Sequence, residues 1–508
     1  MEDPKGAVTA LILNTLAFTV CFACWMLNGV LVTFLVENQL SHWTDAQIGW
    51  LIGIPVLSGS LLRLPVGLLT DKYGGKWVYA TVMLVSAIPM YLLSYANTYM
   101  EFLWCSLGFG IAGTSFAVGI AYTSVWFSRK HQGTALGIFG AGNAGAALTS
   151  MGAPWLLGWL TEGGQNLEAW RQLPKLYAAA LIIMTVLFAL LAIPKKVDDS
   201  HITSFSQRLA PLRHMRVWRF GLYYFLVFGG FVALAQWLIP YYVSVYTMPL
   251  ATAGLLASIF SLPSGCVRAL GGYMSDHFGA RRVMYWVLGS CLVCCALLIV
   301  PRMDIRSPGK AVLAKRGGIV VAASEAQIVV GDVTYPVRVR PVSDGQHLDA
   351  EQDLLVWPAM SAYQEPVVVP GQQVKKKQLL ARGTTHIYFQ ANVWVFTVLL
   401  FVVGIMMGIG KAAVYKHIPD YFPKEVGVVG GIVGVLGGLG GFFCPIIFGY
   451  LLEWTGLWTT CWMFFTLLSA LCLWWMHAVI QRAHYDSTPA LRGRMEQIDP
   501  HHTAIVNR

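Results

Sequence analysis

The feature that most constrains the fold is a series of twelve apolar blocks, each close to the length of a bilayer-spanning helix. A helix needs about 20 predominantly apolar residues for one crossing. Only 12% of the 508 residues are charged, about half the proportion found in soluble domains. We therefore predict an all-α polytopic membrane protein with twelve transmembrane helices. The blocks cover approximately residues 10–36, 47–69, 77–96, 102–127, 134–160, 175–193, 218–242, 250–271, 283–300, 391–411, 427–452 and 457–481.

The distribution of lysine and arginine predicts the orientation of these helices. If the N-terminus is inside, the loops on the cytoplasmic side contain fourteen basic residues, whereas the short loops on the other side contain only Arg171 and Lys175. Positive residues are enriched in cytoplasmic loops, so we expect a multi-pass protein of the inner (cytoplasmic) membrane with both termini cytoplasmic. The same bias explains the net charge of +10, which therefore does not indicate nucleic-acid binding.

One motif occurs twice in the same register. LLRLPVGLLTDKYGGK begins at residue 61 and VRALGGYMSDHFGARR at residue 267, so Arg63 and Arg268 correspond at an offset of 205. Six predicted helices separate the copies, which indicates two six-helix halves that cross the membrane in the same direction. This plan and these loops resemble the major facilitator superfamily. The resemblance implies that four residues are structural signature residues bracing the inward gate: Asp71, Lys72, Asp276 and Arg281.

A second repeat predicts an insertion. Gly133, Gly137 and Gly140 recur as Gly427, Gly431 and Gly434, at an offset of 294 rather than 205, which leaves 89 additional residues. In residues 301–390, QIVVGDVTYPVRVRP alternates like a half-buried strand, and VVVPGQQVKKKQLLARG has the pattern of strand, turn and strand. We expect a β-rich extracytoplasmic insert between the ninth and tenth helices. The predicted domains are the N-terminal bundle (1–195), a cytoplasmic linker (196–217), the C-terminal bundle (218–300 and 391–482), the insert (301–390) and a cytoplasmic tail (483–508).

The two repeated arginines predict an anion site. Arg63 precedes Asp71 by eight residues, about 12 Å along a helix, and a lone arginine at a helix centre costs on the order of 2.5–3.5 kcal/mol. The alternative is that each arginine pairs with a carboxylate, but none of the 25 acidic residues falls in the middle of an apolar block. Because paired guanidinium groups suit a planar oxyanion, we expect a small anion from outside the chain.

Two glycine-rich segments resemble motifs of a known family, and this resemblance suggests which anion is bound. TALGIFGAGNAGAA from residue 134 and GVVGGIVGVLGGLGGFFCP from residue 427 resemble the signature motifs of the nitrate/nitrite porter family of the major facilitator superfamily. The resemblance implies that Arg63 and Arg268 clamp the anion, that Asn143 contacts it and that Phe116 packs against it. It also implies that five glycines serve helix packing and gating: Gly140, Gly142, Gly437, Gly438 and Gly441.

One contact of that family has no direct counterpart. Some members bind substrate through a tyrosine of the seventh helix, and this chain has Leu234 near the expected position. Gln236 or Trp237 would then take the place of the tyrosine in binding the substrate.

The resulting functional hypothesis is nitrate uptake, with nitrite as another substrate, by alternating access. Import of an anion against an inside-negative potential costs about 2.3 kcal/mol per 100 mV, so we expect coupling to protons, with nitrate/nitrite antiport as the alternative. A membrane receptor for a small anion is a further alternative, disfavoured because paired arginines and glycines recur in both halves. No catalytic constellation, metal spacing or cofactor motif is evident, and the ten cysteines all fall in apolar blocks, as small apolar residues do.

Overall fold

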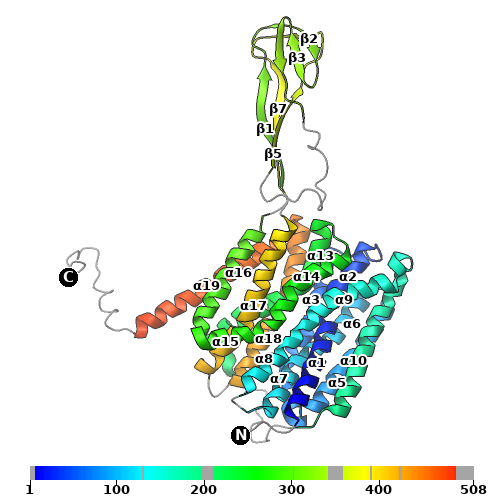
Figure 1. The fold of residues 1–508 in the computed structure, drawn as a ribbon, viewed down its shortest axis with the longest axis vertical. Coiled ribbons are helices and arrows are strands. Elements are labelled where there is room, and N and C mark those ends of the chain that lie inside the picture. The colour runs from blue at the N-terminus through cyan, green and yellow to red at the C-terminus, as the bar shows by residue number, and fades with distance from the viewer. Residues whose placement is uncertain are drawn as a thin grey trace, which may run out of the picture. The chain divides into compact units, whose positions relative to one another are not determined.

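The computed structural model describes residues 6–128, 131–195, 210–300, 303–340, 359–389, 392–422 and 426–487. The chain forms two compact units, one of residues 1–299 with 399–508 and the other of residues 300–398. The first unit is helical and the second is built from β-strands (Figure 1). The expected linker lies outside the described residues up to residue 209, and the expected tail lies outside them from residue 488.

The helical unit begins with a series of helices that are joined by short turns. These are α1 (Ala7–Trp25), α2 (Asn28–Glu37), α3 (Asp45–Leu61), α4 (Arg63–Tyr73), α5 (Gly75–Leu92), η1 (Leu93–Tyr95), α6 (Tyr99–Phe109), η2 (Gly110–Thr114), α7 (Ser115–Trp126), α8 (Gln132–Gly140), η3 (Ala141–Ala144), α9 (Gly145–Leu160), η4 (Glu162–Gly164), η5 (Leu167–Arg171) and α10 (Gln172–Leu191). The elements labelled η here are short 3-10 turns.

A second series of helices completes the unit. It contains η7 (Ala210–Arg213), α12 (Met215–Tyr224), the π-helical turn η8 (Phe225–Gly229), α13 (Gly230–Tyr246), α14 (Leu250–Cys266), α15 (Arg268–Phe278), α16 (Ala280–Leu298), α17 (Val393–Tyr421), α18 (Val426–Thr455) and α19 (Thr460–Ser487).

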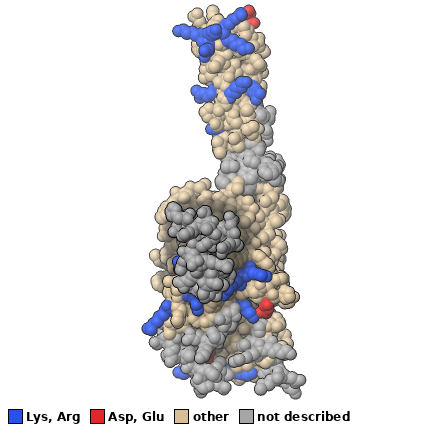
Figure 2. Space-filling view, turned by 90° about the vertical axis from the view of Figure 1, so that its left-hand side faces the viewer, with Lys and Arg blue, Asp and Glu red and all other residues tan. Residues whose placement is uncertain are grey.

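Ten helical spans among the described residues are long and apolar enough to cross a bilayer, and the bent pair α14–α15 would make eleven. The segment expected as a further span, residues 134–160, is divided by the 3-10 turn η3 into α8 and α9. Large apolar side chains such as Trp104, Trp155 and Leu190 are exposed on the unit, and uncharged side chains dominate the face drawn in Figure 2. Such a surface is suited to lipid rather than water.

The repeated motif has the same backbone in both copies. A single residue separates two helices just before each arginine: Leu62 (φ −73°, ψ −6°) precedes the helix that begins at Arg63, and Val267 (φ −72°, ψ −7°) precedes the helix that begins at Arg268. Each new helix ends at a glycine with positive φ, Gly74 at 86° and Gly279 at 85°. These conformations favour glycine because it lacks a Cβ. The sequence repeat is therefore a structural repeat.

One helix is longer than the sequence indicated. The tenth apolar block was placed at 391–411, but α17 continues to Tyr421. That boundary was wrong because Lys411 and the polar residues after it lower the local hydropathy, whereas packing against other helices continues the element. Lys411 consequently lies within the helix, fully buried.

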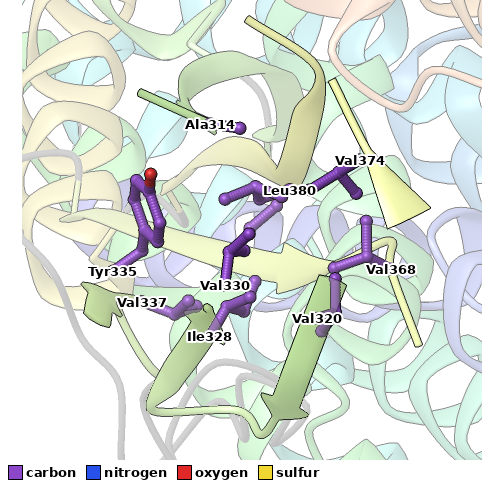
Figure 3. Close-up of a cluster of buried hydrophobic side chains, with 10 residues drawn as sticks. Ala314, Val320, Ile328, Val330, Tyr335, Val337, Val368, Val374 and Leu380 are labelled. Carbon is purple, nitrogen blue, oxygen red and sulfur yellow. The ribbon is translucent and has the colours of Figure 1, made fainter. Parts of the chain in front are cut away.

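The β unit consists of two antiparallel sheets. Strands β1 (Met303–Leu313), β7 (Leu379–Phe389) and β5 (Ala359–Pro366) form one sheet in that order, and β4 (Val333–Pro336), β3 (Gln327–Val330), β2 (Gly318–Ala323) and β6 (Gln373–Val374) form the other. Buried apolar side chains form a core of this unit (Figure 3). Lysine and arginine side chains are visible along the face of the unit drawn in Figure 2.

Two strand predictions in this unit need correction. QIVVGDVTYPVRVRP is a hairpin rather than one strand, because Gly331 has φ 60° and turns the chain between β3 and β4. In VVVPGQQVKKKQLLARG, the residues 367–369 lie in no strand, and β6 contains only two residues.

The core of the β unit gives a first testable prediction. Ile328 in β3 is completely buried, whereas Ile319 in β2 is 58% exposed. In residues 303–389 expressed alone, Ile328→Ala should lower the free energy of unfolding by about 2–5 kcal/mol, and Ile319→Ala by less than about 0.5 kcal/mol. Urea unfolding followed by circular dichroism measures both. Equal losses in the two variants would show that this core is not formed.

Candidate functional site

The two repeated arginines meet at one aromatic ring. Arg63 begins α4 and Arg268 begins α15, and their guanidinium carbons lie 5.3 and 5.2 Å from the centroid of the Phe116 ring. The distance between the two guanidinium carbons therefore cannot exceed the sum of their distances to this centroid. Arg63 also lies 5.7 Å from the Trp25 ring and 5.3 Å from the Phe228 ring. Aromatic faces attract cations, so the rings partly offset the removal of the guanidinium groups from water.

Each arginine reaches a glycine-rich helix of the other half of the chain. Arg63 Nη1 donates a hydrogen bond to the Gly434 carbonyl oxygen in α18, at 2.8 Å. In the other direction, a Cβ added to Gly140 in α8 would lie only 3.0 Å from Arg268 Cδ and 3.5 Å from Arg268 Nη1. The glycines therefore provide the space that the arginine side chains occupy.

Several donors of the arginines lack a partner. Among the residues that the structure describes, no hydrogen-bond acceptor is placed against Arg63 Nε, Arg63 Nη2 or Arg268 Nη1, although all three atoms are buried. The buried charged residues of the described chain include no aspartate or glutamate. Buried donors are normally hydrogen-bonded, and buried charges are normally paired. The site thus has both the charge and the geometry to bind an anion.

Asn143 lies in the 3-10 turn η3, three residues after Gly140. Its side chain is completely buried, and both its amide nitrogen and its amide oxygen lack a partner in the described part of the chain. The buried Asn14 and Asn28 differ, because the Nδ2 of each donates to a carbonyl oxygen, that of Gly119 and that of Leu51 respectively. Mid-helix 3-10 turns often mark functional positions. The unsatisfied amide makes Asn143 the asparagine suited to bind a ligand.

The structure brings two tyrosines to the arginines that the sequence did not indicate. Tyr224, which ends α12 just before the π-helical turn, and Tyr415 of α17 both interact electrostatically with Arg63 and Arg268. Their rings lie 5.0 Å apart, and the Tyr415 hydroxyl donates to the Gly430 carbonyl oxygen at 3.0 Å. Tyr224 precedes the expected position by ten residues, so the spacing of the family motif did not indicate it.

Gln236 and Trp237 are the residues expected to replace the substrate-binding tyrosine of the seventh helix in the family. The Trp237 ring packs against the rings of Phe448 and Trp458. The backbone and Cβ of Gln236 lie against Gly29 of α2. Both atoms of the Gln236 amide and the Trp237 Nε1 atom are nevertheless buried without a hydrogen-bond partner among the described residues. The expectation that Gln236 or Trp237 takes the place of the tyrosine therefore stays a prediction.

The five glycines that are expected to serve packing and gating have different neighbours. A Cβ on Gly142 would meet Phe18, one on Gly437 would meet Tyr224, and one on Gly441 would meet Val232 and Val56. A Cβ on Gly438 would collide with Ser60 Oγ and lie 3.4 Å from Arg63 Nη1. Gly140 and Gly438 therefore border the arginines directly, in addition to allowing close helix packing.

The signature loops contact neighbouring helices. Asp276 forms an ion pair with Lys416 of α17, with 2.5 Å between the Asp276 Oδ1 and Lys416 Nζ atoms. Arg281 donates to the Tyr421 hydroxyl at 2.8 Å, and the Lys72 ammonium lies 5.2 Å from the Tyr73 ring. Exposed pairs of this kind contribute at most about 1 kcal/mol, and the expectation that these residues brace the inward gate stays a prediction.

Comparisons with known proteins identify the family of the chain. The family model of the Major Facilitator Superfamily matches residues 13–324 and 379–500. The probable nitrate/nitrite antiporter NarK1 of Thermus thermophilus is 39% identical over 505 residues, which cover 97% of this chain and 96% of that protein. The nitrite extrusion protein of Bacillus subtilis is 24% identical over 446 residues, which cover 87% of each chain.

Solved structures show the same fold. The nucleoside transporter NupG superposes with a TM-score of 0.58 at 14% identity, covering 94% of this chain and 99% of NupG. A bacterial homologue of the human lysosomal transporter Spinster superposes with a TM-score of 0.59 at 12% identity, covering 94% and 98%. The fold, the repeated signature loops and the full-length similarity together establish that the chain belongs to the nitrate/nitrite porter family of the major facilitator superfamily.

Proposed function

We propose that this protein takes up nitrate, and also nitrite, by alternating access, with the anion bound between Arg63 and Arg268. The observation that carries the proposal is the pair of guanidinium groups at the Phe116 ring, with buried N–H donors that lack partners. The names of the relatives, a probable nitrate/nitrite antiporter and a nitrite extrusion protein, support the same substrate class.

The proposed site recognises the anion by shape as well as charge. A guanidinium group presents planar, parallel N–H donors, which match the planar oxygens of nitrate or nitrite. The Phe116 ring offers a flat apolar wall beside these donors, and the Asn143 amide offers a further N–H. An anion here would be held by charge-assisted hydrogen bonds in a site where the surrounding aromatic rings exclude water.

The proposed coupling is to protons. Uptake of a single anion opposes an inside-negative potential by about 2.3 kcal/mol per 100 mV, whereas one nitrate entering with one proton moves no net charge. Antiport of nitrate against nitrite is the second candidate, favoured by the name of the relative that is 39% identical. The deciding experiment is counterflow of labelled nitrate in proteoliposomes, with nitrate or nitrite inside, repeated with and without an imposed pH gradient.

We also propose the domain and membrane arrangement of the chain. Residues 1–195 and residues 218–300 with 391–482 would be the two six-helix halves, with both termini cytoplasmic and with residues 301–390 outside the membrane on the opposite side. The enrichment of basic residues in alternate loops supports this orientation, and the separate core of the β unit supports its independence from the bundle.

Replacement of residues 303–389 by a short polar linker should therefore preserve nitrate counterflow, because the bundle and its arginines do not depend on the β core. Initial counterflow rates, normalised to the amount of inserted protein, measure the effect. A variant that inserts normally but does not transport would make the β unit part of the transport machinery. The same linker variant with Arg63→Lys serves as the inactive control.

Substitution of either arginine tests the clamp. Arg63→Lys and Arg268→Lys keep the charge but lose the planar fork, so both variants should insert and fold yet lose nitrate counterflow. Arg219→Lys is the matched control, because Arg219 is also buried on a helix but lies 5.4 Å from the ring of its neighbour Phe220 rather than at Phe116. Normal counterflow in both of the first two variants would contradict the clamp.

Substitution of Asn143 tests direct contact with the anion. Asn143→Ala should weaken nitrate binding by about 1.5–3 kcal/mol, the range for a hydrogen bond to a charged group, without lowering the melting temperature of the ligand-free protein. Asn28→Ala should lower the melting temperature and leave nitrate binding unchanged, because Asn28 Nδ2 donates to Leu51 O at 2.6 Å and to Ser106 Oγ at 2.8 Å. Calorimetric titration and thermal unfolding in detergent separate the two effects. A stability loss with unchanged affinity for Asn143→Ala would make it a structural residue.

A further inference from the structure

Another buried cation of the bundle, a lysine, belongs neither to the proposed clamp nor to the signature loops. Lys411 of α17 is completely buried. Its Nζ donates to Ser264 Oγ at 3.1 Å and lies 3.1 Å from the centroid of the Phe231 ring. A charged side chain at this depth is costly and usually marks a functional site.

The surroundings of Lys411 contain another cation but no anion. Arg268 interacts with it electrostatically, and Tyr415 follows it by one turn on α17. The other elements packed against α17 near this point contribute apolar or hydroxyl side chains: Phe260 and Ser264 from α14, Val227 from η8 and Val287 from α16. No buried carboxylate is present in the described parts of the chain. Lys411 therefore faces repulsion from Arg268 without a counter-charge.

Lysine differs from the two arginines in one respect that matters here. A guanidinium group stays protonated under all accessible conditions, whereas a buried amine can exist without its extra proton. The partner of Lys411 suits both forms, because a serine hydroxyl can accept a hydrogen bond from an ammonium group and donate one to a neutral amine.

A negative charge bound at Arg268 would change the electrostatic surroundings of Lys411. The Lys411 ammonium group faces the charge of Arg268, and no buried carboxylate of the described residues offsets that charge when the site is empty. An anion bound at Arg268 offsets that charge and favours the ammonium form. By thermodynamic linkage, the proton must then strengthen anion binding by the same factor by which the anion strengthens proton binding.

We propose that Lys411 is the proton carrier that couples anion transport to the proton gradient; this inference rests on the proposed function. A proton from water on one side adds to the lone pair of the Lys411 amine as nitrate binds at the arginines. After the conformational change, nitrate leaves to the other side, and the ammonium group returns its proton to the water there. One nitrate and one proton cross together, the amine is regenerated, and no net charge moves.

The test compares wild type with Lys411→Met, which cannot be protonated, and Lys411→Arg, which cannot lose its proton. Two activities are measured in proteoliposomes: nitrate counterflow at equal pH, and nitrate accumulation driven by an alkaline interior without a counter-anion. Wild type should do both. Each Lys411 variant should retain counterflow but lose accumulation completely. Lys175→Met, at a lysine beside the Tyr95 ring, should behave like wild type.

A binding measurement provides an independent readout. Calorimetry of nitrate binding in two buffers with different ionisation enthalpies should show that about one proton is taken up per nitrate in wild type and none in Lys411→Met. Accumulation by Lys411→Met, or no proton uptake by wild type, would overturn the coupling role. Loss of counterflow in both Lys411 variants would also overturn it, since Lys411 would then be needed for translocation itself. If wild type shows no nitrate counterflow, the proposed function fails first, and the coupling role with it.

Discussion

The rest of the structure depends on two like charges held at one aromatic ring. Arg63 and Arg268 belong to different halves of the chain, yet both guanidinium groups lie within 5.3 Å of the centroid of Phe116. Two unpaired cations in a low-dielectric interior repel each other and lack hydration. Aromatic faces, one backbone carbonyl and the space beside glycines offset part of this cost. The guanidinium N–H donors that remain without a partner among the described residues are the basis of the proposed anion site.

The same contacts join the two halves. Arg63 donates to a carbonyl oxygen of α18, 371 positions away in the chain, while Arg268 packs against Gly140 of α8. Each half thus contributes an arginine that rests on the glycine-rich helix of the other. A change in the position of one half moves its arginine relative to that helix. Under the proposed clamp, anion binding and the relative movement of the halves would therefore be mechanically linked through these two side chains.

Much of the fold could be predicted from the sequence, because its determinants are local. Apolar block length determines which segments can span a bilayer, and the offset between repeated motifs locates the insert. The β unit was predicted less accurately. Short strands there depend on cross-strand pairing, and a single glycine with positive φ, Gly331, turned one expected strand into a hairpin. Likewise, nothing local showed that the glycine-rich segment at Asn143 contains a 3-10 turn while α18 continues unbroken.

The sequence by itself determined the class of protein, its family and the pair of arginines without a carboxylate partner, since each of these follows from composition, spacing or motif. Only the tertiary structure decided what surrounds those arginines. Tyr224, Tyr415 and Lys411 come to Arg268 from helices that are distant in sequence. The physical reason is that burial and electrostatic contact depend on which helix faces meet. Hydropathy is lowered by a lysine wherever it points, so it indicated the end of a helix at Lys411 where packing instead buries that residue.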